Sequence, residues 1–159
     1  MDTTSGDDGG HTNLHTGLPT DLPTVTGLAE LARLVRDHDR LYLRYSHGPD
    51  RDSSAVSKDY ESGLELPGLS VTVLTPEKWW TRPLEDWLAR QVRQYASLVE
   101  EDPERCGWVL QGRTVAHGPD HEPLLDQVRP VAYLSETVME EALERYRRRF
   151  DAGRGPTDA

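Results

Sequence analysis

The stretch PLEDWLARQVRQYASLV, residues 83–99, decides the fold because it carries the clearest helical pattern in the chain. Pro83 stands where a helix can begin, since the first helical position needs no amide hydrogen. Apolar residues then recur at intervals of three and four, which places them on one face of a helix. The pattern predicts a central helix with one buried face, interrupted only by Gln91. Its apolar members are Leu84, Trp87, Leu88, Val92, Tyr95, Leu98 and Val99.

The segment before this helix contains one more helical pattern and two strand patterns. Leucine and valine recur at helical spacing from Leu28 to Val35, so a first helix is expected to end near His38. The run LYLRYS at 41–46 is rich in β-forming residues, and its alternation sets an apolar face opposite a face that carries Arg44. Residues 69–74 predict a second strand, entered through the turn at Pro67-Gly68.

The segment after the central helix is expected to hold short strands and a final helix. Strand patterns occur at 108–110 and 114–116, and the Gln111-Gly112-Arg113 sequence between them favours a hairpin turn. Further strand patterns lie at 124–125 and 131–134, and Ser135 can cap a last helix that begins acidic and ends basic. The elements together predict an α+β fold, a small mixed and mainly antiparallel sheet with about three helices.

The two ends of the chain differ in composition from the part between them. Residues 1–23 contain four aspartates, no lysine or arginine, and many glycines, threonines and prolines. Such a segment has little apolar surface to offset the entropy of ordering it, so we expect a disordered acidic tail. Residues 24–150 are expected to form a single α+β domain, and residues 151–159 a frayed C-terminal tail.

Net charge restricts the partners of this chain. Its 159 residues carry 18 Lys+Arg and 28 Asp+Glu, a formal net charge of −10. Bulk binding to nucleic acid or to anionic lipid needs a basic surface, which this composition opposes, although a small local anion site at Arg44 remains compatible with it. A protein partner is also compatible with this charge.

A single cysteine, Cys106, excludes an intramolecular disulfide framework and a multi-cysteine zinc site. The chain also lacks a signal-peptide pattern and an apolar run long enough to span a membrane, so we expect a cytoplasmic protein. Neither a P-loop nor a G-x-G-x-x-G motif occurs, which leaves nucleotide binding of those two types without support.

The tetrapeptide HGPD occurs twice, at 47–50 and 117–120, each time directly after a strand pattern. Gly-Pro-Asp chemistry favours two turns. An alternative is that both loops lie at one end of the sheet and form a metal site from nitrogen and oxygen ligands. The residues of that alternative site are His47, Asp50, His117, Asp120, His121 and Glu122.

Two further features suggest a non-enzymatic interaction or regulatory protein. Trp79 and Trp80 are adjacent and cannot both face one core, so one of them is expected at a pocket wall or an interface, whereas Trp87 is expected in the core. The basic cluster Arg145 to Arg149 is typical of a solvated helix end. Together with the acidic tail, these features support a non-enzymatic interaction or regulatory protein as the alternative to an enzyme.

Four strings together resemble a family of small actinobacterial proteins that share a domain of unknown function. They are LYLRYSHGP (41–49), DYESGLELPGLSV (59–71), WWTRPLEDWLARQV (79–92) and GPDHEPLL (118–125). The resemblance covers residues 25–145 and implies no activity.

A second resemblance is to ADP-ribosyltransferase-like domains. These domains carry an arginine on an early strand, a serine on a following strand and a glutamate just before a late strand, and Arg44, Ser70 and Glu122 occur in that order. The resemblance implies NAD as cofactor, with Arg44 holding its phosphate or ribose and Tyr42 or Trp79 stacking on nicotinamide. Glu122 would stabilise the oxocarbenium-like state, and Ser70 would orient the Glu122 carboxylate.

Each residue of this candidate triad also has a structural interpretation. Arg44 can pair with a carboxylate such as Glu61, Ser70 can be an ordinary strand residue, and Glu122 can lie in a solvated turn. Asp120 stands where many members of the resembled class have Glu or Gln, and the usual Ser-Thr-Ser form is missing around Ser70. The order of the three residues predicts a site only if the fold brings them together.

Overall fold

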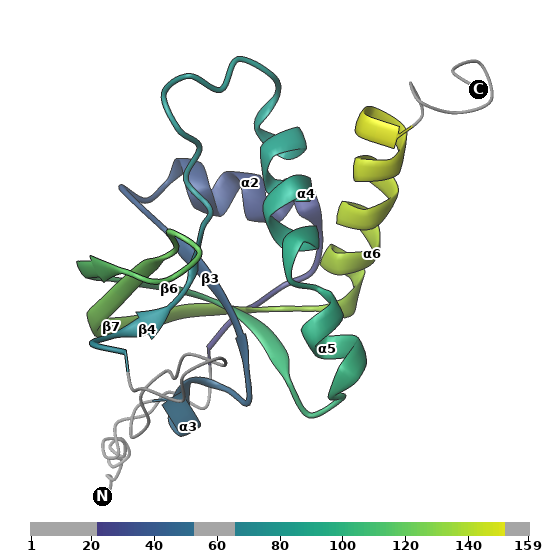
Figure 1. The fold of residues 1–159 in the computed structure, drawn as a ribbon. Helices are drawn as coiled ribbons and strands as arrows, with labels where there is room; N and C mark the ends of the chain where they lie inside the picture. Colours follow the sequence, from purple (N-terminus) through teal and green to yellow (C-terminus); the bar gives the residue numbers. More distant parts are fainter. Residues whose placement is uncertain (1–21, 53–65, 152–159) are drawn as a thin grey trace, which may run out of the picture.

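Helices and strands of a computed structural model, which describes residues 22–52 and 66–151, form one α+β fold (Figure 1). This confirms the fold class expected from the sequence. The predicted tails lie almost entirely outside the described residues. The elements are β2 (Thr24–Val25), α2 (Leu28–Arg36), β3 (Tyr42–Ser46), α3 (Pro49–Asp52), β4 (Leu69–Ser70), β5 (Thr72–Val73), α4 (Leu84–Gln94), α5 (Ser97–Glu101), β6 (Cys106–His117), β7 (Pro123–Leu134), α6 (Glu136–Tyr146) and the π-helical turn η2 (Arg147–Asp151).

The described strands form one mixed, mostly antiparallel sheet. Its order is β2-β7-β6-β3-β5, and β4 pairs with β7. Only the β2–β7 pairing is parallel. Val71 alone separates β4 from β5, yet β4 pairs with β7 while β5 pairs with β3. The chain from Leu69 to Val73 therefore links two strands that are not neighbours in the sheet, and the sheet curls on itself.

The predicted hairpin at Gln111-Gly112-Arg113 is wrong. A single strand, β6, runs through these residues, and the patterns at 124–125 and 131–134 are likewise the two ends of β7. Glycine at position 112 eases a close approach between strands and does not mark a turn: a Cβ there would make a tight contact of 3.1 Å with the Asp126 carbonyl oxygen. The β6–β7 register shifts between Gln111 and Arg113, so the residues that suggested a turn form a β-bulge.

Strand alternation divides the core into two clusters, one on each face of the sheet. Figure 1 shows α2, α4 and α6 gathered on one side of the sheet. They cover the face that carries Leu41, Leu43 and Tyr45, as the pattern at 41–46 predicts. The opposite face holds a smaller cluster of buried residues, which consists of Tyr42, Val71, Trp108, Leu110 and Leu125.

Helix α4 is shorter than the sequence predicts. It ends at Gln94, and a separate helix, α5, begins at Ser97. Hydrogen bonds fix α4 to the sheet: the Trp87 indole donates to the Leu74 carbonyl at 3.0 Å, the Gln91 side-chain amide donates to the Val73 carbonyl at 2.7 Å, and the Tyr45 hydroxyl donates to the Val92 carbonyl at 2.6 Å. Burial also raises the pKa of Tyr45, which keeps its phenol neutral as a donor.

The basic cluster at the end of α6 is more than a solvated helix end. Asp86 of α4 is fully buried, and its two carboxylate oxygens accept hydrogen bonds from Arg145 at 2.7 Å and Arg149 at 3.2 Å. Arg82 lies 3.3 Å from the same carboxylate. These three arginines clamp the C-terminal helical segment onto α4, while Arg147 and Arg148 lie near the exposed Glu144.

No helix in the described part of the chain has the length and apolar character needed to cross a membrane.

Candidate functional site

Arg44 projects from β3 on the face opposite α2, α4 and α6. Its Nε lies 2.7 Å from Asp52 Oδ2, and its Nη1 donates to the carbonyl oxygen of Ser70 at 2.7 Å. The two side chains of this ion pair are only 17% and 9% exposed. The carboxylate that neutralises Arg44 is thus Asp52, contributed by the short helix α3, whereas Glu61 lies outside the described residues.

Ser70 connects Arg44 to Glu122. The Ser70 hydroxyl donates to Glu122 Oε2 at 3.0 Å, while its carbonyl accepts the hydrogen bond from Arg44. Glu122 Oε1 accepts from the Asp120 backbone amide at 2.9 Å, which fixes the carboxylate inside the turn between β6 and β7. The three residues of the candidate triad therefore belong to one hydrogen-bonded chain that joins β3, β4 and this turn.

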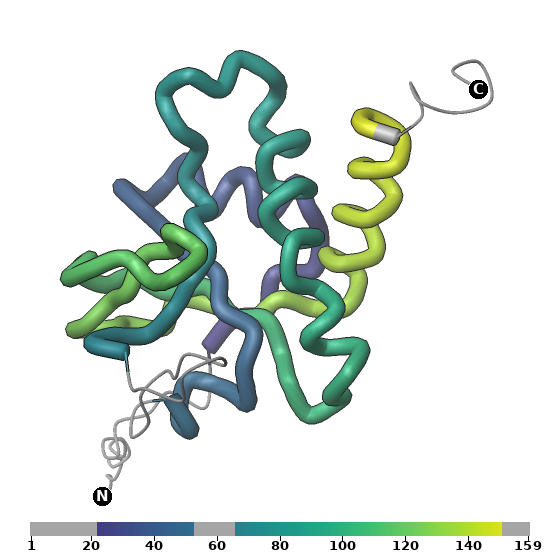
Figure 2. Tube along the Cα trace, in the orientation of Figure 1, coloured from purple at the N-terminus to yellow at the C-terminus, as the bar shows by residue number. Residues whose placement is uncertain are grey.

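Tyr42 and Trp79, the alternative residues expected to stack on nicotinamide, lie in different parts of the fold. Tyr42 is 3% exposed and belongs to the core cluster on the open face of the sheet. Trp79 is 65% exposed and contacts Trp80 and Trp87 edge-on. It lies on the connection between β5 and α4, which Figure 2 traces as an arch. Trp87 is buried in the cluster under the helices, which confirms the prediction of a core Trp87, and Trp79 is the more exposed member of the adjacent pair.

The alternative of one metal site built from both HGPD loops is wrong. Ser46, which precedes the first loop, pairs with Cys106 at the start of β6, whereas His117 is the last residue of β6. The loops therefore lie at opposite ends of that strand. His47 Nε2 instead lies 2.7 Å from Asp102, and this hydrogen bond lowers the pKa of Asp102. Among the described residues, no group of three or more His, Cys, Asp or Glu side chains could hold a metal.

Cys106 shows no sign of a nucleophile. Burial raises the pKa of its thiol, and the carboxylates of Asp52 and Asp50 raise it further. A raised pKa reduces the thiolate fraction at neutral pH, which disfavours a nucleophilic role for Cys106.

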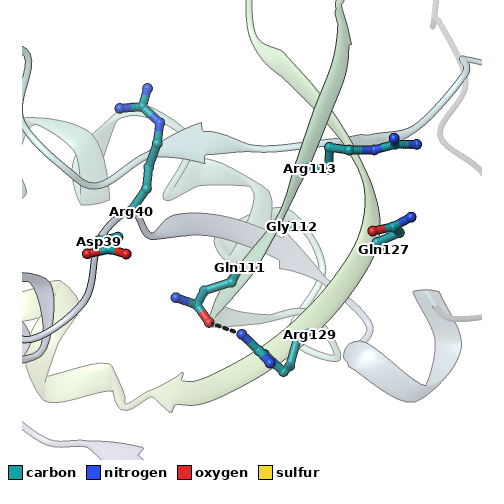
Figure 3. A pocket seen from close by; sticks show the side chains of 7 residues that line it. All are labelled: Asp39, Arg40, Gln111, Gly112, Arg113, Gln127 and Arg129. Atoms are coloured by element: carbon teal, nitrogen blue, oxygen red, sulfur yellow. Dashed lines mark hydrogen bonds between the residues drawn. The ribbon is translucent and has the colours of Figure 1, made fainter.

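Sequence reasoning missed an open pocket of about 510 Å³ (Figure 3). Its residues come from three segments of the chain. These are a pair of residues shortly before β3, the β-bulge of β6, and the middle of β7. The lining consists of Asp39, Arg40, Gln111, Gly112, Arg113, Gln127 and Arg129. Its backbone is irregular, since Gln127 has a φ of 51°, a left-handed conformation that is uncommon outside glycine. The β-bulge at Gln111–Arg113, which the sequence pattern predicted as a hairpin turn, therefore forms part of the pocket wall.

The charges around this pocket, which we call the arginine pocket, are incompletely balanced. Arg113 pairs with Asp126 across the strands through contacts of 2.9 and 2.7 Å, which raise the pKa of Arg113 and lower that of Asp126. Arg129 donates to Gln111 Oε1 at 2.7 Å, and Arg40 donates to the Tyr42 hydroxyl at 3.0 Å. Within residues 22–52 and 66–151, no carboxylate forms a salt bridge with Arg40 or Arg129.

The arginines of this pocket are brought together by the register of β6 and β7. Arg129 pairs with Gln111, and Arg113 with Asp126, only because each strand continues through the bulge. If the hairpin turn were at 111–113, these residues would lie in a turn and not face one another. A sequence pattern with glycine flanked by polar residues in the middle of a long strand is the signal that could have indicated the bulge.

Comparison with known proteins gives one match. Searches against curated proteins and against solved structures found no significant match. A family model described as a family of unknown function matches residues 18–156, which include every residue of both sites described above. The chain therefore belongs to the family of unknown function DUF6098.

Proposed function

We propose that this protein is a binding domain for a small anionic ligand, which it holds in the arginine pocket. The observation that carries the proposal is that Arg40 and Arg129 line one concave surface with Arg113 and have no carboxylate partner among the described residues. The planar guanidinium group matches phosphate and carboxylate oxygens, often through two parallel hydrogen bonds. Arg40 and Arg129 are exposed, so their charges are available to a ligand from solvent.

The overall charge of the chain favours a small ligand over a polymer. A long polyanion would meet the repulsion of a protein with a formal net charge of −10 along most of its length. A small anion feels mainly the nearest charges, because electrostatic interactions in water are screened within roughly 8 Å at physiological salt. The sequence allowed such a local site at Arg44, but Asp52 neutralises that arginine, whereas Arg40 and Arg129 have no such partner in the described chain.

Pyrophosphate titration tests this proposal. We expect saturable binding that weakens as salt rises, and about a tenfold loss of affinity in Arg129→Ala and in Arg40→Ala, since a hydrogen bond to a charged group contributes about 1.5–3 kcal/mol. Isothermal titration calorimetry measures both. Arg36→Ala is the matched control, because Arg36 is an exposed arginine of α2 that does not line the pocket. The absence of binding, or equal losses in Arg36→Ala and Arg129→Ala, would refute the proposal.

A second candidate function is NAD binding with ADP-ribosyl transfer at Arg44, Ser70 and Glu122. It is favoured by one observation, the chain of hydrogen bonds in which Ser70 joins the other two residues. In this function the bond between ribose C1′ and the nicotinamide nitrogen breaks, and nicotinamide leaves with the electron pair. A nucleophile of the acceptor then bonds to C1′ and releases its proton. Glu122 would stabilise the positive charge that develops on the ribose, and Ser70 would hold Glu122 in place.

The test of this second candidate separates binding from transfer. NAD at millimolar concentration should raise the melting temperature, because a ligand of the native state stabilises it. Nicotinamide release should be lost in Glu122→Gln and kept in Glu136→Gln, which removes an exposed carboxylate at the start of α6. No thermal shift with NAD would remove the candidate. A shift without nicotinamide release would reduce it to NAD binding.

A further inference from the structure

The size of the arginine pocket exceeds what a bare inorganic anion needs. Its volume of about 510 Å³ falls within the range of roughly 300–1,000 Å³ that small-molecule sites occupy. Figure 3 shows the guanidinium groups of Arg40, Arg113 and Arg129 spread around the rim and turned in different directions. Arg113 is paired with Asp126, which leaves Arg40 and Arg129 for an anionic group and the rest of the lining for other parts of a larger ligand.

The remaining side chains of the pocket suit hydroxyl groups. Asp39 places a carboxylate on the same rim, which repels an anion but accepts hydrogen bonds from hydroxyls. Gln127 offers both an amide donor and a carbonyl acceptor. Gln111 accepts a hydrogen bond from Arg129 through Oε1, and Figure 3 shows its amide nitrogen pointing away from Arg129, where it can act as a donor. The lining therefore combines positive charge with acceptors and donors for neutral polar groups.

The backbone that lines the pocket departs from regular β-strand geometry at two places. Gln127 adopts a left-handed φ of 51°, and the register shift between Gln111 and Arg113 lies on the strand that it faces. Bulges often redirect a side chain near a binding site, and a strained backbone at a rim is a reason to suspect function. Both irregularities meet at this one pocket.

We propose that the ligand of the arginine pocket is a phosphorylated sugar, either free or as part of a nucleotide. This inference rests on the proposed function and specifies its ligand. Arg129 and Arg40 bind the phosphate, whereas Asp39 and Gln127 bind the hydroxyls of the sugar. The two pairs of residues thus have separable roles.

Calorimetric titration with four probes tests this division of roles: inorganic phosphate, ribose, ribose 5-phosphate and AMP. We expect ribose 5-phosphate to bind at least about tenfold more tightly than phosphate, and ribose alone to bind too weakly to detect. Asp39→Asn and Gln127→Gly should abolish that tenfold advantage without weakening phosphate binding. Glycine is chosen at position 127 because it accepts the left-handed backbone without strain. Arg129→Ala should weaken both phosphate and ribose 5-phosphate.

The outcomes distinguish this inference from the proposed function. If phosphate and ribose 5-phosphate bind equally, or if the advantage survives in Asp39→Asn and in Gln127→Gly, the sugar assignment is overturned while the anion site stands. If none of the phosphate-bearing probes binds, both proposals fail. AMP binding at least as tight as that of ribose 5-phosphate identifies a nucleotide as the source of the sugar phosphate, and weaker AMP binding identifies the free sugar phosphate.

Discussion

Replacing Arg44 with alanine is expected to destabilise the protein by about 3–5 kcal/mol, the usual cost of removing one partner of a buried ion pair. Asp52 is only 9% exposed, and its Oδ2, which also accepts a hydrogen bond from the Ser46 hydroxyl, would lose its contact with the guanidinium. The hydrogen bond from Arg44 to the Ser70 carbonyl would also be lost. A negative charge left in a poorly hydrated position explains most of the expected effect.

A double-mutant cycle isolates this interaction. Urea denaturation of Arg44→Ala, Asp52→Ala and the double variant should show that the double variant loses less stability than the sum of the single variants, because its second substitution removes the stranded charge. Arg44→Lys should be intermediate, since lysine keeps the charge but cannot bridge Asp52 and Ser70 in the same geometry. Additive losses, or an Arg44→Ala loss below about 1 kcal/mol, would contradict a structural role for this pair.

The second large effect is expected at Asp86. Asp86→Ala should cost about 3 kcal/mol, because it removes charge-assisted hydrogen bonds that join α4 to the C-terminal helical segment. The effect stays near the lower end of the usual range because Arg82 and Arg149 are 40% and 45% exposed and regain contact with water. Glu85→Ala is the matched control, a neighbouring carboxylate for which the described residues show no salt bridge.

The Asp86 contribution depends on pH in a defined direction. Burial raises the pKa of this carboxyl, but hydrogen bonds from Arg145 and Arg149 outweigh burial and hold the pKa below its ordinary value. Its stabilisation is therefore complete above the unfolded pKa of about 3.9 and is lost as the pH falls through the lower folded value. The difference in unfolding free energy between wild type and Asp86→Asn should be constant near neutral pH and shrink in acid. A difference that grows in acid would contradict this assignment.

Local patterns predicted the fold well where periodicity is strong. The helical spacing at 84–94 and the alternation at 41–46 correctly assign their buried faces, since one face of each element must leave water. The β6–β7 pair was misassigned because a glycine within a long strand resembles a turn residue when its partner strand is unknown. What distinguishes the two cases is a tertiary contact, the close approach of Gly112 to the Asp126 carbonyl oxygen, from which a Cβ would lie only 3.1 Å away.

The candidate sites also divide into a part that the sequence predicted and a part that depends on tertiary contacts. Chain order predicted Arg44, Ser70 and Glu122 as a group, and the fold links them by hydrogen bonds. The sequence did not identify the ion pair with Asp52, because α3 brings that carboxylate back toward β3 after a turn. It also could not indicate the arginine pocket, because Arg40 and Arg129 are 89 positions apart and meet only through the curled sheet.

Nuclear magnetic resonance of the ¹⁵N-labelled protein during titration with pyrophosphate shows directly whether the arginine pocket binds a small anion. Binding in the pocket should produce saturable shifts of the Gly112, Gln127 and Arg129 backbone amides and of the Arg40 and Arg129 Nε–H signals, with the Arg44 and Ser70 signals unchanged. Unchanged pocket signals, or shifts confined to Arg44, Ser70 and Glu122, would contradict it.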